Sequence, residues 1–334
     1  MATLVDIANY TGLAISTVSK YFNGGSLRPY NKTKIENALK VLDYRPNQAA
    51  RTLKTKRTYS IGILVPNLQS SFDTHIITAI EQELTAANYS SILCTYGSDP
   101  KIEAKKLRFL LDKQVDGLAL LPSGTIHKEL FEYLEENKKI VLFDRVLDGF
   151  SFDAVITNNS QITEDLVDFL VMQGHREIGI ITNTVYTGSQ RLEGYKHGLI
   201  KHGIEIKESL IRIGSWSIHD GRNHMDSLLT CNPRLTAVIA CSEELCLGTV
   251  QILREKKIHI PDDISVVGFD MYGISTLTDP AITAVEQPVD EMGKNIVDIL
   301  LRKIQLDEVQ VGTIHCFNAS IDNRQSVRHI PQPH

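Results

Sequence analysis

Two residues of opposite charge, Arg191 and Asp270, have the side chains needed to bind a polyhydroxylated ligand. Asp270 follows the apolar run that begins at Ile264, so it lies near the predicted carboxyl end of a strand. Ligands of doubly wound sheets bind beyond these strand ends. A guanidinium supplies a rigid fork of donors and a carboxylate accepts, so the pair could hydrogen-bond adjacent hydroxyl groups. Alternatively, the two side chains only pair with each other as an ordinary salt bridge.

Trp216, the only tryptophan, follows another predicted strand and could stack against the ring of a ligand. The apolar C–H face of a sugar and the π face of a purine both suit an aromatic side chain. Packing within the hydrophobic core is the alternative, since buried tryptophans are common.

The patterns typical of nucleotide-binding enzymes, hydrolases and zinc proteases are missing. The chain contains no G-x-G-x-x-G, G-K-[ST], G-x-S-x-G or H-E-x-x-H. His219 and His224 are five residues apart, as are His197 and His202, so neither pair shares a helix face as residues four apart do. We therefore expect no catalytic residue, no metal site and no cofactor.

The charge of the chain is unevenly distributed. Residues 1–58 carry ten Lys and Arg against three acidic residues, a charge of +7, whereas the remainder carries 25 against 37, a charge of −12. A basic segment on an acidic body predicts that one end meets a polyanion such as nucleic acid.

Two short helices joined by a glycine-containing turn are predicted near the amino terminus. Apolar residues recur at helical spacing over residues 4–8, Gly12 breaks the pattern, and a second run covers residues 16–22. In such a helix-turn-helix, the second helix enters the major groove of DNA. A third helix over about 32–42 closes the small core. The predicted base readers are Ile15, Ser16, Thr17 and Lys20, and the predicted inward residues are Val18 and Phe22.

A basic stretch follows this small unit. Pro46 ends the preceding helix, and Asn47 can cap a new short helix that runs to Leu53. A solvated linker is the alternative for this stretch.

The remainder alternates short apolar runs with longer amphipathic ones, which is typical of βα units in parallel sheets. One series begins at Ile61 and a second follows Asn158, so two Rossmann-like lobes are implied. The five scattered cysteines favour reduced thiols over a disulfide framework. The sequence has neither a secretory signal nor an apolar stretch of about 18 residues, so we expect a cytoplasmic protein with no membrane partner.

Together these segments resemble one family along the whole chain. The stretch Leu4–Ala8, with Ser16–Lys20, Asn23-Gly24, Asp43–Asn47 and Ala50–Leu53, resembles the start of lactose-repressor/galactose-repressor (LacI/GalR) proteins. Lys20 departs from the arginine frequent at that place, and Ala14-Ile15-Ser16 replaces the usual serine-led opening. Motifs of the body that carry the resemblance are Lys113–Gly117, Gly174-His175-Arg176, Arg191–Tyr195 and Ile260–Asp270.

The resemblance implies an all-α helix-turn-helix headpiece, followed by an α/β two-lobed periplasmic-binding-protein-like domain with parallel doubly wound sheets. The headpiece would be residues 1–58 with a hinge helix at about 47–55, and residues 59–330 would bind an effector and dimerise. The implied N-lobe is about 59–157 with 287–316, and the implied C-lobe is about 158–285 with 317–330.

A homodimer on a palindromic double-stranded DNA operator is implied, with Leu53 wedged into the minor groove. The implied DNA contacts are Thr3, Ile15, Ser16, Thr17, Ser19, Lys20, Asn23, Asn47, Ala50, Arg51, Leu53 and Lys54. The implied effector contacts are Ser71, Phe72, Asp144, Arg191, Trp216, Ser242 and Asp270. Ser242 and Glu243 stand where relatives usually have Asn-Asp, so the effector need not be theirs.

The resemblance predicts a repressor of genes for sugar uptake or catabolism, gated by a sugar or sugar phosphate. Three alternatives stay open at this point. The gate could be a purine, or a protein corepressor of the phosphocarrier type, or the chain could be a solute-binding protein without a DNA function.

Overall fold

The structure is a computed structural model that describes residues 2–22, 25–44, 57–97, 99–124, 139–306 and 312–331. The chain divides into two compact units, Met1–Thr58 and Tyr59–His334. The predicted hinge helix at about 47–55 lies outside the described residues. So do the predicted DNA contacts Asn23, Asn47, Ala50, Arg51, Leu53 and Lys54.

The first unit contains helices α1 (Leu4–Thr11), α2 (Ile15–Phe22) and α3 (Pro29–Val41). A capping box between Thr3 and Asp6 begins α1, and Gly12 in the left-handed conformation ends it. The predicted start of α3 at Lys32 was three residues late, because Pro29 pre-sets the backbone angle of a first helical turn. As predicted, Val18 is buried and Phe22 packs against the small core, which is formed by Ile7, Ala8, Val18, Ile35 and Ala38.

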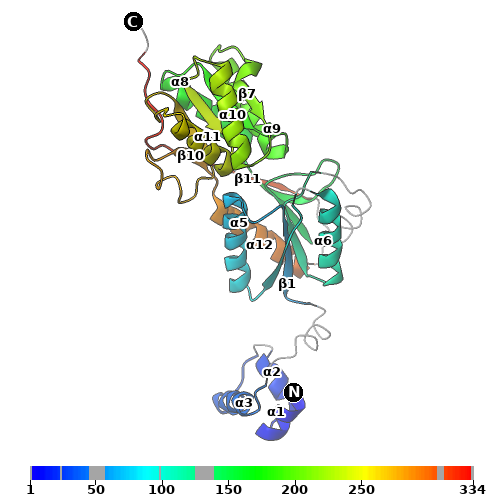
Figure 1. The fold of residues 1–334 in the computed structure, drawn as a ribbon. Coiled ribbons are helices and arrows are strands. Elements are labelled where there is room, and N and C mark those ends of the chain that lie inside the picture. Colours follow the sequence, from blue (N-terminus) through cyan, green and yellow to red (C-terminus); the bar gives the residue numbers. More distant parts are fainter. Residues whose placement is uncertain are drawn as a thin grey trace. The chain divides into compact units, whose positions relative to one another are not determined.

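The second unit contains two six-stranded sheets, which define an N-lobe and a C-lobe (Figure 1). The N-lobe sheet has the order β11-β5-β4-β3-β1-β2, and each of its strand pairs is parallel. Its strands are β1 (Ser60–Val65), β2 (Ser90–Thr95), β3 (Gly117–Leu120), β4 (Ile140–Phe143), β5 (Asp153–Thr157) and β11 (Ile314–Phe317).

The C-lobe sheet has the order β12-β10-β9-β8-β6-β7. The prediction of parallel sheets was wrong at its edge: β12 is antiparallel to β10, because β12 returns from the other lobe after only two residues. Its strands are β6 (Ile178–Thr182), β7 (Ile211–Ile213), β8 (Ala237–Ala240), β9 (Ser265–Phe269), β10 (Thr283–Glu286) and β12 (Ser320–Asp322), with a 3-10 helix, Glu208–Leu210, before β7.

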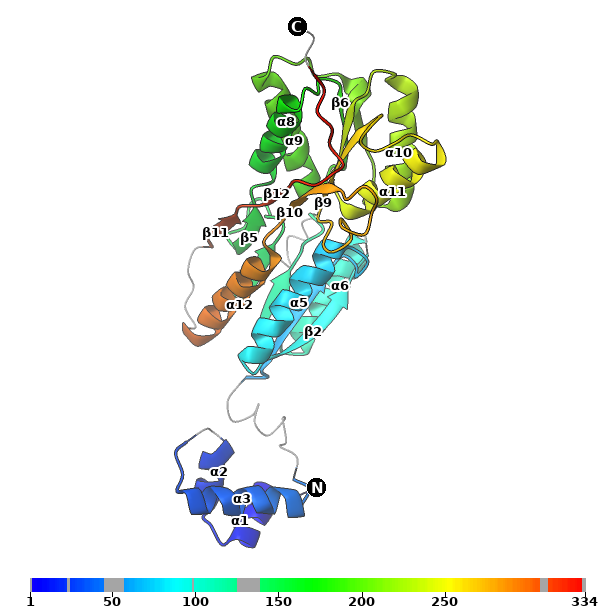
Figure 2. The same ribbon diagram turned by 90° about the vertical axis from the view of Figure 1, so that its left-hand side faces the viewer.

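Helices cover both faces of each sheet, as apolar runs buried on two sides require. In the N-lobe, α5 (Ser71–Ala86) and α12 (Val289–Leu306) lie side by side on one face (Figure 2). Ile61 and Ile63 of β1 point to that face, whereas Leu64 packs in the core that contains residues of α6 (Pro100–Asp112). In the C-lobe, the helix pairs are α8 (Asn159–Met172) with α9 (Tyr186–Lys201), and α10 (Ile218–Cys231) with α11 (Glu243–Glu255).

The two strand orders correspond position by position, so β4 matches β9 and β5 matches β10. The chain passes between the sheets at three places: between β5 and α8, between β10 and α12, and between β11 and β12. The first and third crossovers are tied together at Asn158, whose N–H donates to the carbonyl of Phe317 at 3.0 Å and whose Oδ1 accepts from the N–H of Ala319 at 2.9 Å. Any rotation between the lobes must therefore act on this hydrogen-bonded group.

Candidate functional site

A cavity of about 860 Å³ lies where the strands of both sheets end. Its N-lobe wall comes from the segments that follow β1 to β4, and its C-lobe wall from those that follow β6 to β9. The carboxyl ends of parallel strands meet at one edge of a sheet, and in this unit the two edges face one cleft. We call this cavity the cleft.

Arg191, in α9, is held by three partners at the wall of the cleft. Its Nε donates to Oδ1 of Asn159 at 2.7 Å, and its Nη1 donates to the carbonyl oxygen of Cys241 at 2.6 Å. Its Nη2 lies 3.5 Å from Oδ2 of Asp270. The guanidinium carbon also lies 4.1 Å from the ring centroid of Phe269, a cation–π distance. The side chain is 3% exposed, so its orientation is fixed before any ligand arrives.

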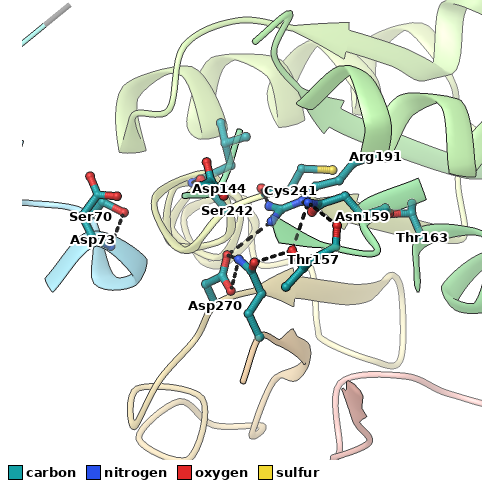
Figure 3. A network of polar contacts seen from close by, with 12 residues as sticks. Ser70, Asp73, Asp144, Thr157, Asn159, Thr163, Arg191, Cys241, Ser242 and Asp270 are labelled. Atoms are coloured by element: carbon teal, nitrogen blue, oxygen red, sulfur yellow. Dashed lines mark hydrogen bonds and ion pairs between the residues drawn. The ribbon is translucent and has the colours of Figure 1, made fainter. Parts of the chain in front are cut away.

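These contacts belong to a closed polar ring of five residues, four of which are labelled in Figure 3. Nδ2 of Asn159 donates to Oγ1 of Thr157 at 3.0 Å, and that hydroxyl donates to Oε1 of Gln287 at 2.6 Å. Nε2 of Gln287 in turn donates to both carboxylate oxygens of Asp270, at 3.0 and 3.1 Å. Asp270 also accepts from the hydroxyl of Tyr272 at 3.1 Å. Because Thr157 and Gln287 lie at two interlobe crossovers, the ring connects the cleft wall to the segments on which the lobes turn.

Asp144 and Asp270 occupy matching places in the two lobes. Asp144 follows β4 and Asp270 follows β9, and both have left-handed backbones, with φ of 64° and 56°. The N–H of Asp144 donates to Val155 at 2.9 Å, and that of Asp270 donates to Val285 at 2.8 Å. A positive φ is unfavourable for residues other than glycine, and such strain is concentrated at functional sites. Each lobe thus directs one buried carboxylate into the cleft.

The cleft is rich in carboxyl groups with raised pKa values. Burial, followed by the negative charge of Asp144, raises the pKa of Asp73 to about 8. Burial also raises the pKa of Asp144 above its ordinary value, although Arg145 and Arg191 oppose it. The pKa values of Glu243 and Glu244, at the start of α11, are likewise raised by burial.

Most of the predicted effector contacts lie together at the cleft. Phe72, Asp144, Arg191, Trp216, Ser242 and Asp270 all line it, and Trp216 also packs against both cores of the C-lobe. Ser71 is not among the lining residues; its hydroxyl interacts with Glu243 of the other lobe instead. Arg191 and Asp270 do pair with each other, as the salt-bridge alternative predicted, and they also line the cleft.

Sequence reasoning missed Asp73, Asn159 and Gln287. Gln287 directly follows β10 and Asn159 begins α8, so both are polar residues at strand ends, the signal that identified Asp270. Asp73 is adjacent to the predicted contact Phe72. Its burial and the lack of a partner for its carboxylate, described below, have no signal in the sequence.

In the first unit, Ile15, Ser16 and Lys20 are exposed on α2, whereas Thr17 and Ser19 are half-buried. Thr3 is exposed, but its hydroxyl donates to Oδ2 of Asp6 at 2.8 Å within the capping box. Lys34 fixes α3 to the end of α1 by donating to the carbonyl of Thr11 at 3.1 Å. The small core therefore presents one side of α2 to solvent.

Within the described residues, no helix has the length and apolar character required to cross a membrane. The same residues contain no group of three or more His, Cys, Asp or Glu placed to hold a metal ion.

Comparisons with known proteins cover almost the whole chain. Residues 58–326 match the family described as periplasmic binding proteins and sugar binding domain of LacI family. The chain is 32% identical to a probable HTH-type transcriptional regulator, EndR, of Paenibacillus polymyxa, over 98% of both chains. It is 30% identical to the ribose operon repressor of Escherichia coli (strain K12), over 93% of this chain and 95% of the repressor. Among solved structures, it resembles the transcriptional regulator CelR in complex with cellobiose, with 25% identity, a TM-score of 0.74, and 98% and 100% of the two chains covered.

Proposed function

Because this chain belongs to the LacI family of transcriptional regulators, we propose that it is a ligand-gated repressor of genes for sugar uptake or catabolism. In this proposal it binds a palindromic operator as a homodimer, and a small polar effector in the cleft controls that binding. The observation that carries the proposal is the pairing of Arg191 with Asp270 at the wall of an interlobe cleft, within a chain whose first unit is a basic helix-turn-helix.

The first unit has the features of a DNA reader. Its charge of +7 favours a polyanion, and α2 exposes Ile15, Ser16 and Lys20 toward a major groove. The remaining proposed contacts in this unit are Thr3, Thr17 and Ser19, with Asn23, Asn47, Ala50, Arg51, Leu53 and Lys54 outside the described residues. Two copies with two-fold symmetry match a two-fold operator.

The cleft has the features of a sugar site. Asp144, Arg191, Ser242 and Asp270 offer donors and acceptors for hydroxyls, and Phe72 and Trp216 offer apolar faces for the C–H surface of a ring. These six residues are the proposed effector contacts, and Ser71 is proposed to act from the edge of the cleft through Glu243. One relative is named a ribose operon repressor and one similar structure is a complex with cellobiose, which supports a carbohydrate effector.

The polar ring suggests how a ligand at the cleft alters the lobes. A ligand that binds Arg191 and Asp270 changes the strength of two hydrogen bonds, the one from Arg191 to Asn159 and the one from Gln287 to Asp270. Asn159 and Gln287 lie at the crossovers. The ligand then favours one relative orientation of the lobes, because it has different affinities for the two orientations. In a dimer, that change alters the spacing of the two DNA-binding units.

The experiment that tests the proposal begins with selection of DNA by the purified full chain. Fluorescence anisotropy of the selected, labelled operator is then followed with and without a panel of sugars, sugar phosphates and purines. We expect saturable, salt-dependent binding that at least one carbohydrate shifts. Failure to enrich any DNA sequence would refute the repressor and favour a solute-binding function.

A further inference from the structure

The charges that line the cleft are unbalanced. Among the described residues that line the cleft, five carry carboxyl groups, two carry guanidinium groups and none is a lysine. The five acids are Asp73, Asp144, Glu243, Glu244 and Asp270, and the two bases are Arg145 and Arg191.

Both guanidinium groups are already engaged with the protein. Arg191 is held by Asn159, Cys241 and Asp270, as described above. Nε of Arg145 lies 3.5 Å from Oδ2 of Asp144, in an ion pair without a hydrogen bond, and Nη1 donates to the carbonyl of Pro122 at 2.9 Å. An anionic ligand such as a sugar phosphate would therefore meet three further carboxyl groups and no free cation within the described wall.

Asp73 is the strongest indication of what the cleft is built to accept. It lies in the first turn of α5 and is 5% exposed, and no described residue donates a hydrogen bond to its carboxyl group, although the positive charge of Arg145 acts on it. The contact at this residue is between its own backbone N–H and the hydroxyl of Ser70, at 3.4 Å (Figure 3). A buried carboxyl group without a hydrogen-bond donor keeps its proton, unless a ligand supplies a cation that stabilises the ionised form.

Two further acids of the cleft come from the other lobe. Glu243 and Glu244 begin α11, and Oε2 of Glu243 is buried without a hydrogen-bond partner. The negative charge of Glu244 acts on Asp73 across the cleft, as does that of Asp270. Carboxylates of two lobes that face each other repel, so a cation placed between them would favour closure of the cleft.

We propose that the effector of this chain carries a protonated amine as well as hydroxyl groups, as an amino sugar does, and that the ammonium binds at Asp73. The proposal rests on the ligand-gated function above and narrows its ligand class. Arg191 and Asp270 bind hydroxyls on one side of the ligand, while Asp73 binds the ammonium, and Glu244 is close enough for its negative charge to stabilise that of the ammonium. Amino acids fit poorly, since their carboxylate would find no free cation in the described wall.

The fluorescence of Trp216 is a direct probe, because this single tryptophan lines the cleft. The full chain is titrated with matched compounds that differ in charge alone or nearly so. The amines are glucosamine, galactosamine, mannosamine and the β-1,4-linked dimer of glucosamine. Each amine is compared with its N-acetylated form and with the neutral sugar that has a hydroxyl group in place of the amine. The 6-phosphates of the three amino monosaccharides are also titrated. Thermal unfolding with each compound gives an independent measure of binding.

We expect at least one amine to bind roughly 10- to 100-fold more tightly than its N-acetylated and neutral counterparts, the range for a hydrogen bond to a charged group. Its 6-phosphate should bind more weakly than the unphosphorylated amine. In Asp73→Asn, the preference for the amine over its neutral counterpart should decrease to less than about threefold, within the scatter of weak contacts. Asp298→Asn, which removes an exposed carboxylate of α12, should retain the preference.

Three results would overturn the inference: no amine of the panel binds, neutral or phosphorylated compounds bind at least as tightly, or Asp73→Asn keeps the preference. The comparison of amine with N-acetylated compound uses the unaltered chain, so it remains decisive if Asp73→Asn fails to fold. Operator selection separates this inference from the function on which it rests. If the chain binds an operator and a neutral sugar releases it, the amine-bearing effector is refuted but the repressor function is supported. If no DNA sequence is enriched, the repressor function itself is refuted.

Discussion

The hydroxyl of Thr157 donates a 2.6 Å hydrogen bond to Oε1 of Gln287, a residue 130 positions later in the chain. The bond joins the crossover after β5 to the crossover after β10. Both residues are buried, and both contact members of the polar ring that hold Arg191 and Asp270. The hydrogen bonds of the ligand-binding pair and those of the interlobe connections are therefore one network.

Thr157→Val should destabilise the protein by about 1–3 kcal/mol, because the isosteric side chain leaves Oε1 of Gln287 buried without a donor. Urea unfolding monitored by circular dichroism measures the change. Thr78→Val is the matched control: its hydroxyl is exposed on α5 and bonds only within the helix, so its effect should stay within about 0.5 kcal/mol. Equal effects of the two substitutions would show that the bond between the crossovers contributes little.

Arg191→Ala should abolish the response to effector and destabilise the fold by about 3–5 kcal/mol, because Asp270 is left buried without its cation. The double variant Arg191→Ala/Asp270→Asn should recover part of that stability and still lack the response. Operator anisotropy with saturating effector and urea unfolding measure the two effects. A normal effector response in the double variant would contradict the assignment of this pair as the effector site.

Replacement of Asp73 should change how stability depends on pH. Burial and the nearby Asp144 raise its pKa to about 8, so the native state keeps a proton that the unfolded chain has released above about pH 4. Its contribution to stability is present at low pH and is lost as pH rises from about 4 to about 8. The stability of Asp73→Asn relative to the unaltered chain should therefore increase by more than about 1.4 kcal/mol over that range. Urea unfolding at several pH values tests this, and a constant difference would exclude a raised pKa.

His175 should have the opposite dependence on pH. It lies buried between Oγ1 of Thr236 at 3.0 Å and the carbonyl of Arg328 at 3.2 Å, and burial lowers its pKa to about 4. In the unfolded chain, this imidazole takes up a proton near pH 6.5, whereas in the native state it stays neutral until about pH 4. The protein therefore loses stability as pH decreases from about 6.5 to about 4. His175→Gln should be less stable at neutral pH, and its disadvantage should narrow on acidification. If the difference in unfolding free energy between the unaltered chain and His175→Gln is the same at about pH 7 and at about pH 4.5, the imidazole is not buried in its neutral form.

Leu53→Ala should weaken specific operator binding far more than non-specific binding. A smaller side chain cannot unstack a base step, whereas phosphate contacts from the basic residues around it remain. Anisotropy with the selected operator and with random duplex at one salt concentration gives the ratio. Similar losses on both DNAs would refute a minor-groove wedge.

Local patterns in the sequence were sufficient for the elements and for much of the cleft. Apolar periodicity located the helices of the first unit and the two series of βα units, because one buried face per helix and two per parallel strand leave distinct patterns. Asp270 could be predicted as a cleft residue because strand ends meet at a common edge, whereas the place of Arg191 within α9 followed from the family resemblance. The motif Gly174-His175-Arg176 had no physical explanation in the sequence alone. The structure shows the physical reason for its glycine: Gly174 has a φ of +93°, and a Cβ there would clash with the carbonyl oxygen of Ile330.

Only the tertiary structure decided which side chains form hydrogen bonds with each other and which have no hydrogen-bond partner. Thr157 and Gln287 are too far apart in sequence for any local pattern to pair them, and their bond exists because three crossovers converge. The cleft between the lobes brings Asp73, an aspartate of a first helical turn, near the negative charges of Glu244 and Asp270 from the other lobe. Sequence determines charge and periodicity residue by residue, whereas desolvation and Coulomb energy depend on every group that folding brings within a few ångströms.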